Sequence, residues 1–254
     1  MSNGPVRFCR YAYAPNALGY CGPDDHRALL EYGAHQVVDG GLLQLARGFE
    51  GAWPYLSLIA EANDIADPLD DRVVEAYWVG NGLLDNVQES ATYRFLEERF
   101  RPRMGIRRWS AVGTTSFARG CVHHNHHVFV VYPWVGMLRL EGSIEPLRVL
   151  ESCRIRPGRI VETVSDSALV ASRPLIFDGS ALSLGPERIE EVKVAEDGLG
   201  FALDLLPGDV VSLHWDWVCE RITAGQLTAL NLATTSALEI ANSVLREPGN
   251  PIPS

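Results

Sequence analysis

The stretch ESCRIRPGRIVE (residues 151–162) lies close to the point where the pattern of the chain changes from helical to strand-like. It places Cys153 four residues ahead of a Pro-Gly pair, which is followed by a short β-branched run. Pro-Gly pairs favour turns, and β-branched residues favour strands. The thiol then has two interpretations: a small core residue on a strand, or a ligand that holds something.

The chain beyond residue 147 predicts several short strands and a closing helix. The segments with strand character are PLRVLESC, GRIVETV, ALVASRPL, EEVKVA and DVVSLHWDWV. Short strands at such spacing, separated by turn residues, are typical of a small barrel. The stretch TAGQLTALNLATTSALEIANSVLRE then predicts one amphipathic helix that starts near Thr223 and ends before Pro248.

The first half of the chain is predicted to be mostly helical. From Pro23 to about Pro102, amphipathic blocks alternate with Gly, Pro and Asp clusters, and Asp pairs precede several blocks, as is common at helix starts. The stretch HHVFVVYPWVGMLRLE has strand character with a proline break. We therefore expect an α+β protein with a mostly helical domain carrying a few strands (residues 1–146), followed by a small β-barrel and a C-terminal helix (residues 147–254).

Composition narrows the possible functions. The 254 residues carry a formal net charge of -10, and Lys193 is the only lysine. An acidic chain of this kind argues against a nucleic-acid partner, which would need a basic surface. The sequence shows no export signal and no apolar run long enough for a membrane span, so we expect a cytoplasmic protein without a membrane partner. The odd number of cysteines favours free thiols or metal ligands (Cys9, Cys21, Cys121, Cys153 and Cys219).

The C-terminal third resembles a known family. The segments CRIRPGRIVE, SALVA and PGDVVSLHWDWVCERI, within residues 150–225, are similar in order and spacing to the HypC/HupF family of [NiFe]-hydrogenase maturation chaperones. Cys153 takes the place of the family's cysteine and His214 that of its histidine. The resemblance implies an OB-like barrel and an iron site at Cys153 with His214 close by. The cargo would be an iron fragment with cyanide and carbonyl ligands, and the partner a hydrogenase large subunit or another maturation protein.

One departure from the family concerns the position of the cysteine. In the family it follows the initiator methionine and therefore offers an α-amine beside the thiol, whereas Cys153 lies inside this chain. A domain of this kind could dock on the same partner without carrying the fragment. The alternative interpretation makes Cys153 a core residue on a barrel strand and His214 a strand histidine with its hydrogen bonds satisfied.

A histidine cluster, CVHHNHHVFVVYPW, is the second unusual stretch. On a strand, His124 and His126 would share one face, and His123 and His127 would share the other. Either pair could chelate a transition metal, with a third ligand such as Cys21 or Cys121 from elsewhere. Cys21 is better placed than Cys9 or Cys219 to be a thiolate, because it precedes a helix start, which lowers the pKa of a thiol. The cluster could also form a polar pocket without metal, or a surface group without function.

Two functions follow, and a third interpretation remains. The first is an accessory or maturation factor for a [NiFe]-hydrogenase that carries or docks an iron fragment through the HypC-like domain. The second is a metal-dependent enzyme that acts on a small molecule through the histidine cluster, and that makes or delivers a ligand of the iron site. In the third, the protein is a scaffold with neither site metallated.

Overall fold

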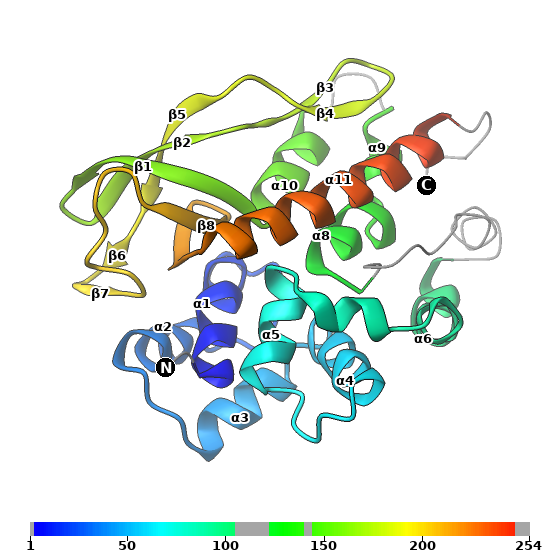
Figure 1. The fold of residues 1–254 in the computed structure, drawn as a ribbon, viewed down its shortest axis with the longest axis horizontal. Helices are drawn as coiled ribbons and strands as arrows, with labels where there is room; N and C mark the ends of the chain where they lie inside the picture. Colours follow the sequence, from blue (N-terminus) through cyan, green and yellow to red (C-terminus); the bar gives the residue numbers. More distant parts are fainter. Residues whose placement is uncertain (1–2, 105–121, 140–143, 247–254) are drawn as a thin grey trace.

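Helices form the first part of the chain, and strands follow them. The computed structural model describes residues 3–104, 122–139 and 144–246. The first helices are α1 (Gly4–Ala17), α2 (His26–His35), α3 (Gly40–Arg47), α4 (Trp53–Ala62), α5 (Asp71–Trp78), the 3-10 helix η1 (Gly82–Asn86) and α6 (Glu89–Met104). After the first gap come α8 (His124–His126), the π-helix η2 (His127–Val131), α9 (Trp134–Met137) and α10 (Glu145–Cys153). The protein is therefore α+β, with its helices and strands largely separated along the chain (Figure 1).

Five strands pair in a closed order. They are β1 (Arg156–Val164), β2 (Ser167–Ser172), β5 (Arg188–Lys193), β8 (Val210–His214) and β9 (Trp217–Arg221). The order is β1-β2-β5-β9-β8, and β8 also pairs with β1. The pairs are antiparallel except for β5 with β9, which meet in parallel at Lys193 and Trp217. Two short hairpins complete the strands: β3 (Leu175–Phe177) with β4 (Leu182–Leu184), and β6 (Ala195–Glu196) with β7 (Leu199–Gly200).

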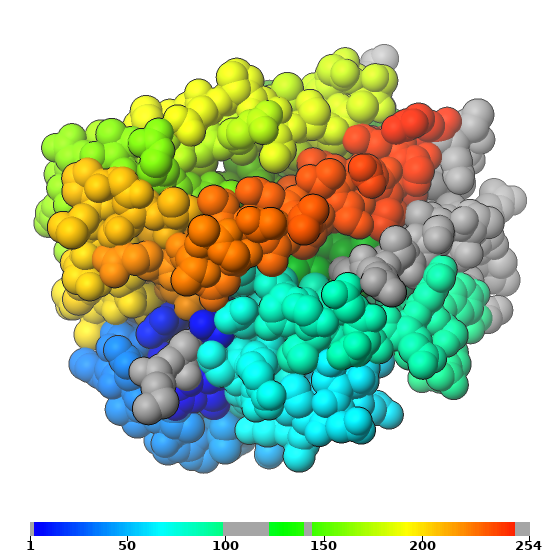
Figure 2. Space-filling model, in the orientation of Figure 1, coloured from blue at the N-terminus to red at the C-terminus, as the bar shows by residue number. Residues whose placement is uncertain are grey.

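The long helix α11 (Ala224–Arg246) confirms the predicted closing helix. Figure 2 shows it as an orange-to-red band across the molecule, between the strands and the N-terminal helices. No described helix has the length and apolar character needed to cross a membrane.

One hydrophobic core joins the N-terminal helices to the strands. The cluster that contains Phe8 and Tyr77 also contains Leu150, Trp217 and Leu230, while a second, smaller cluster fills the closed sheet. The predicted boundary between residues 146 and 147 falls inside α10, and this core lies on both sides of it. The division into two domains stays a prediction.

The segment PLRVLESC is a helix, so the predicted strand there is wrong. Pro146 lies in the first turn of α10, where its missing N–H costs no hydrogen bond. The buried residues Pro146, Val149 and Leu150 follow helical spacing, and Cys153 continues the same face. Cys153 therefore ends a helix just before β1, instead of lying on a strand.

The histidine stretch is also helical, which corrects the predicted strand. The described residues before α10 contain no strand. Residues 122–131 are buried without alternation, so neither face turns to solvent. Asn125 fixes this segment, because its side chain accepts a hydrogen bond from the Ile155 N–H at 2.7 Å and donates to the Ile155 carbonyl at 2.9 Å. Tertiary packing here overrides the β propensity of the valines.

Helix α1 was not predicted. Its segment contains Pro15 and several aromatic residues, and almost every residue from Gly4 to Asn16 is buried. A helix buried on all sides has no amphipathic stripe to recognise. It matters for the site because it carries Tyr11, which contacts the end of β8.

Candidate metal centre

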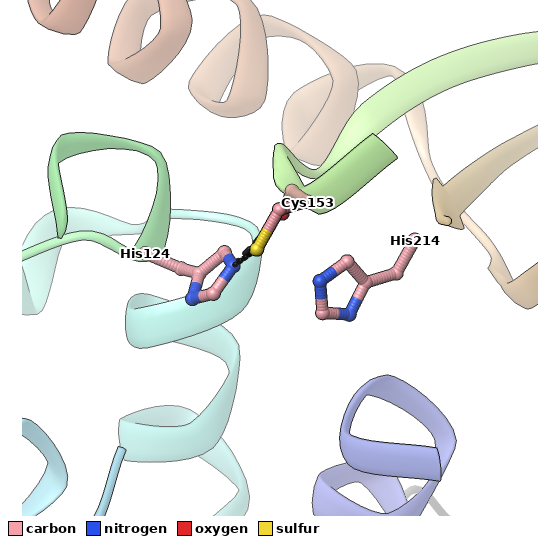
Figure 3. A group of neighbouring side chains, drawn as sticks. All are labelled: His124, Cys153 and His214. Atoms are coloured by element: carbon pink, nitrogen blue, oxygen red, sulfur yellow. Dashed lines mark hydrogen bonds between the residues drawn. The ribbon is translucent and has the colours of Figure 1, made fainter. Parts of the chain in front are cut away.

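Three side chains from distant parts of the chain meet between the helices and the strands. Cys153 is the last residue of α10, His214 is the last residue of β8, and His124 is the first residue of α8. One ligand atom from each lies within 4.8 Å of the other two. In Figure 3 the sulfur of Cys153 points toward the His124 ring, and the His214 ring lies on its other side. The structure thus brings together Cys153 and His214, and adds one member of the histidine cluster.

The thiol of Cys153 is neutral in the absence of a metal. Its Sγ lies 3.9 Å from Nε2 of His124. Burial raises the pKa of this thiol above its ordinary value of 9.0, and the nearby Cys21 raises it further. A metal ion that binds there must therefore displace a proton, since the thiolate is the ligand.

His214 is held in the tautomer that a metal ligand needs. Its Nδ1 lies 2.6 Å from the backbone carbonyl of Tyr11, so Nδ1 carries the proton and donates it to that oxygen. Nε2 keeps its lone pair and has no hydrogen-bond partner among the described residues. Burial lowers the pKa of His214 to about 4, although the Tyr11 carbonyl opposes this shift. A backbone carbonyl behind the ring is a common support for a metal-bound histidine.

His124 contacts both Cys153 and helix α5. Its Nε2 lies 2.9 Å from the Cys153 carbonyl, and its Nδ1 lies 3.2 Å from the hydroxyl of Tyr77. Burial lowers its pKa well below 6.5, and the neighbouring His214 lowers it further. The ring of Trp78 packs against both imidazoles, with centroids 4.6 Å and 5.6 Å apart. The two histidines are therefore neutral, which is the form that binds metals.

A cavity of about 170 Å³ adjoins the three side chains. Its wall is largely aromatic and contains no Asp, Glu, Lys or Arg. Besides the cluster, the lining includes Tyr77, Trp78, Cys21, His127, Tyr132, Trp134 and Trp215. Trp215 follows His214 with a left-handed φ of 56°, a conformation that is uncommon for a bulky residue. The cavity leaves space beside the cluster for further groups on a metal.

The other predicted ligands do not join the cluster. Cys21 and His127 line the same cavity, but His127 Nδ1 lies 2.7 Å from the hydroxyl of Tyr55. Burial raises the pKa of Cys21 to about 12, which opposes the effect expected from the helix start. His123 accepts a hydrogen bond from the N–H of Asn125 through Nδ1. His126 is buried away from this cavity lining, and Cys121 lies outside the described residues.

The pairing of the histidines also differs from the strand prediction. On the helical backbone, it is His124 and His127 that border one cavity, with ring centroids 6.5 Å apart. All four histidines from His123 to His127 are buried, so a surface cluster is excluded.

Sequence reasoning missed the residues that support the ligands. Tyr77 lies on a predicted helix, but nothing in its spacing connects it to His124. Tyr11 acts through its backbone carbonyl, which any residue would supply. His124 meets Cys153 and His214 because α8 packs against α5 and α11 and contacts the end of α10. No short sequence motif indicates this packing.

The donor set is suited to a transition metal. A thiolate with two imidazoles matches ions such as Zn²⁺, Fe²⁺ or Co²⁺, and three protein ligands leave a position for another group. The cluster of His124, Cys153 and His214 could hold a metal ion on these grounds.

Comparison with known proteins places the chain in a family. A family model described as "Family of unknown function (DUF6390)" matches residues 1–248, so the chain belongs to that family. The match includes all three residues of the cluster. No curated protein and no solved structure matches the chain.

Proposed function

We propose that this member of the DUF6390 family is an accessory factor in the maturation of a [NiFe]-hydrogenase. In this proposal it carries an iron fragment on Cys153, His214 and His124. The observation that carries the proposal is the meeting of Cys153 with His214. By the resemblance, these two residues take the places of the cysteine and the histidine of the HypC/HupF family. Their distant places in the sequence did not require them to meet.

The strand arrangement supports the same proposal. The closed order of five strands, followed by α11, is compatible with the OB-like, HypC-like barrel that the resemblance implies. In this reading the histidine at the end of β8 lies beside the cysteine that precedes β1, because β8 pairs with β1.

His124 compensates for the internal position of Cys153. A cysteine inside the chain has no α-amine to offer a metal, because its nitrogen is part of a peptide bond. The imidazole of His124 lies 3.9 Å from the sulfur and supplies a nitrogen donor in its place. A thiolate is a good ligand for low-spin iron with strong-field ligands, and the adjoining cavity offers room for such ligands.

The test is anaerobic purification from a host with an active hydrogenase maturation system. We expect iron by elemental analysis and infrared bands in the cyanide and carbonyl stretching region. Cys153→Ala and His214→Ala should lose both, whereas Cys9→Ala, which removes another buried thiol, should retain both. The hydrogenase large subunit or another maturation protein should co-purify with the wild type. Iron-free protein from such a host, together with unchanged hydrogenase maturation after deletion of the gene, would refute the proposal.

A metal-dependent enzyme is the second candidate. The observation that favours it is the cavity, whose lining includes the polar groups of His127 and Tyr132 as well as the three residues of the cluster. Such a site could activate a small molecule on the metal, including a future ligand of the iron site. A metal that is lost in His124→Ala, in protein without cyanide or carbonyl bands, would favour the enzyme over the carrier.

A further inference from the structure

His124 and Tyr77 together have three hydrogen-bond contacts but only two protons to satisfy them. Nε2 faces the Cys153 carbonyl, which only accepts, and Nδ1 faces the Tyr77 hydroxyl, which can donate or accept. Tyr77 also lies 3.3 Å from the Gly51 carbonyl. A neutral imidazole carries one N–H and a tyrosine one O–H, so these contacts separate into two alternative sets.

In the first set, His124 does not bind a metal. Nε2 carries the proton and donates it to the Cys153 carbonyl, while Tyr77 donates its proton to Nδ1. The lone pair that could reach a metal beside the Cys153 sulfur is then absent. The hydroxyl of Tyr77 makes no hydrogen bond to Gly51 in this state.

In the second set, the hydrogen bond between Tyr77 and His124 is reversed, and the bond from Nε2 to the Cys153 carbonyl is lost. Nδ1 carries the proton and donates it to the oxygen of Tyr77, and Tyr77 donates its own proton to the Gly51 carbonyl. Nε2 then presents a lone pair beside the Cys153 sulfur. In the absence of a metal, this lone pair faces the Cys153 carbonyl at 2.9 Å, an unfavourable contact between two acceptors that a bound cation would relieve.

We propose that Tyr77 is a positioning residue for the metal centre, and that its hydroxyl holds His124 in the ligating tautomer when a metal binds. The proposal deepens the proposed function, since it rests on the same three ligands. In this proposal Tyr77, hydrogen-bonded to the Gly51 carbonyl, fixes the tautomer of His124, as the Tyr11 carbonyl fixes that of His214. The two histidines differ in one respect: His214 is fixed in its ligating tautomer, whereas His124 can change.

The direct test is ¹⁵N NMR of the imidazole nitrogens in wild-type protein, with Zn²⁺ as the diamagnetic probe. We expect the His124 resonances to change from the Nε2–H pattern to the Nδ1–H pattern on Zn²⁺ addition. His214 should keep the Nδ1–H pattern throughout. A His124 ring that shows Nδ1–H before metal addition, or Nε2–H after it, would overturn the proposal.

A variant gives an independent measurement. Tyr77→Phe should lower the affinity for Co²⁺ about 10- to 100-fold, as is usual when an outer partner of a metal-bound histidine is lost. The thiolate-to-cobalt charge-transfer band should still form at saturation. Tyr55→Phe is the matched control: Tyr55 is buried, stacks on Tyr77 and contacts His127 instead of His124. Equal Co²⁺ affinity for both variants would contradict the role of Tyr77.

These measurements separate this proposal from the proposed function. Zn²⁺ and Co²⁺ report on the ligands alone, so the tautomer change can occur in a protein that has no part in hydrogenase maturation. A chain that carries iron in its host but shows no tautomer change would retain the proposed function and lose only the role of Tyr77. Far-ultraviolet circular dichroism of both variants checks that they fold.

Discussion

Cys153 is the residue of the candidate metal centre that should make metal affinity depend on pH. In the metal-free protein Cys153 is a thiol whose pKa is raised by burial, whereas the metal-bound residue is a thiolate. The two histidines add no protons, because burial lowers the pKa of both. Binding of a divalent ion should therefore release one proton, and this proton comes from Cys153.

This stoichiometry predicts the slope of metal affinity against pH. The apparent Co²⁺ affinity should rise about tenfold per pH unit from near pH 6 to pH 8.5, because low pH favours the metal-free thiol. Isothermal titration in buffers of different ionisation enthalpy measures the released protons. A slope of zero would show that Cys153 does not lose a proton on binding, and a slope of two protons per ion would show that another ligand also deprotonates.

Two of the three residues of the candidate cluster could be selected from the sequence. Cys153 and His214 could be selected because they belong to ordered motifs. His124 was one of several candidates in its stretch, and the wrong backbone period paired it with His126. Tyr77 and Trp78 contact His124 and distinguish it from the other histidines. They lie on a helix, and no residue spacing in the sequence indicates this contact.

The elements around the centre are held by a few polar contacts between segments. Asn125 is completely buried and links α8 to the residue before β1, through both the N–H and the carbonyl of Ile155. It also donates to Thr234 on α11 at 2.9 Å. This one side chain fixes the element that carries His124 relative to the elements that carry Cys153.

Asn125→Ala should therefore weaken both the fold and the site. It leaves buried backbone groups of Ile155 without partners, at a cost of about 1–3 kcal/mol for each unsatisfied group. We expect thermal unfolding at a clearly lower temperature, and a lower Co²⁺ affinity because His124 is displaced. Asn86→Ala removes an exposed amide that contacts Asn63 and should change neither. Equal unfolding temperatures for the two variants would show that α8 is held by apolar packing alone.

Most helices and strands could be predicted, and the exceptions share a physical cause. Helices α2, α3 and α5 each have an aspartate N-cap whose side chain accepts a backbone hydrogen bond. These helix starts can be recognised in the sequence. Helix α1 and the segment 122–131 are buried on nearly all sides, so the periodicity that identifies an element is absent. For residues 146–153 the helical spacing was present, but the valine and leucine content favoured a strand.

A buried ion cluster connects the N-terminal helices to the strands. Arg7 on α1 lies 3.2 Å from Glu220 on β9, 2.9 Å from Asp71 and 3.2 Å from Glu75 on α5. The side chain of Arg7 is 6% exposed and that of Glu220 is 7% exposed. Tyr11, whose carbonyl supports His214, also donates to Glu220 at 2.9 Å. The cluster therefore ties the N-terminal helices to the strand pair that carries the histidine.

Arg7→Ala should destabilise the protein strongly. It removes the closest cation from the buried Glu220 carboxylate and leaves Arg10 at 3.7 Å. Breaking a buried ion pair typically costs about 3–5 kcal/mol. For a chain of this size, each kcal/mol corresponds to roughly 2–4 °C, so the unfolding temperature should fall by about 6–20 °C. Arg72→Ala breaks an exposed pair with Asp70 and should change the unfolding temperature little. Comparable changes in the two variants would mean that the buried cluster contributes no more than a surface pair.

The three residues of the candidate metal centre come from segments that the ribosome completes at different times. A growing polypeptide that has emerged only as far as the first strands already contains Cys153 and His124, yet it lacks the second imidazole and the strand that positions it. Such an unfinished chain offers only two side chains to an ion, and two side chains would bind the ion weakly. If the cluster binds a metal ion, tight binding therefore requires synthesis to continue past His214.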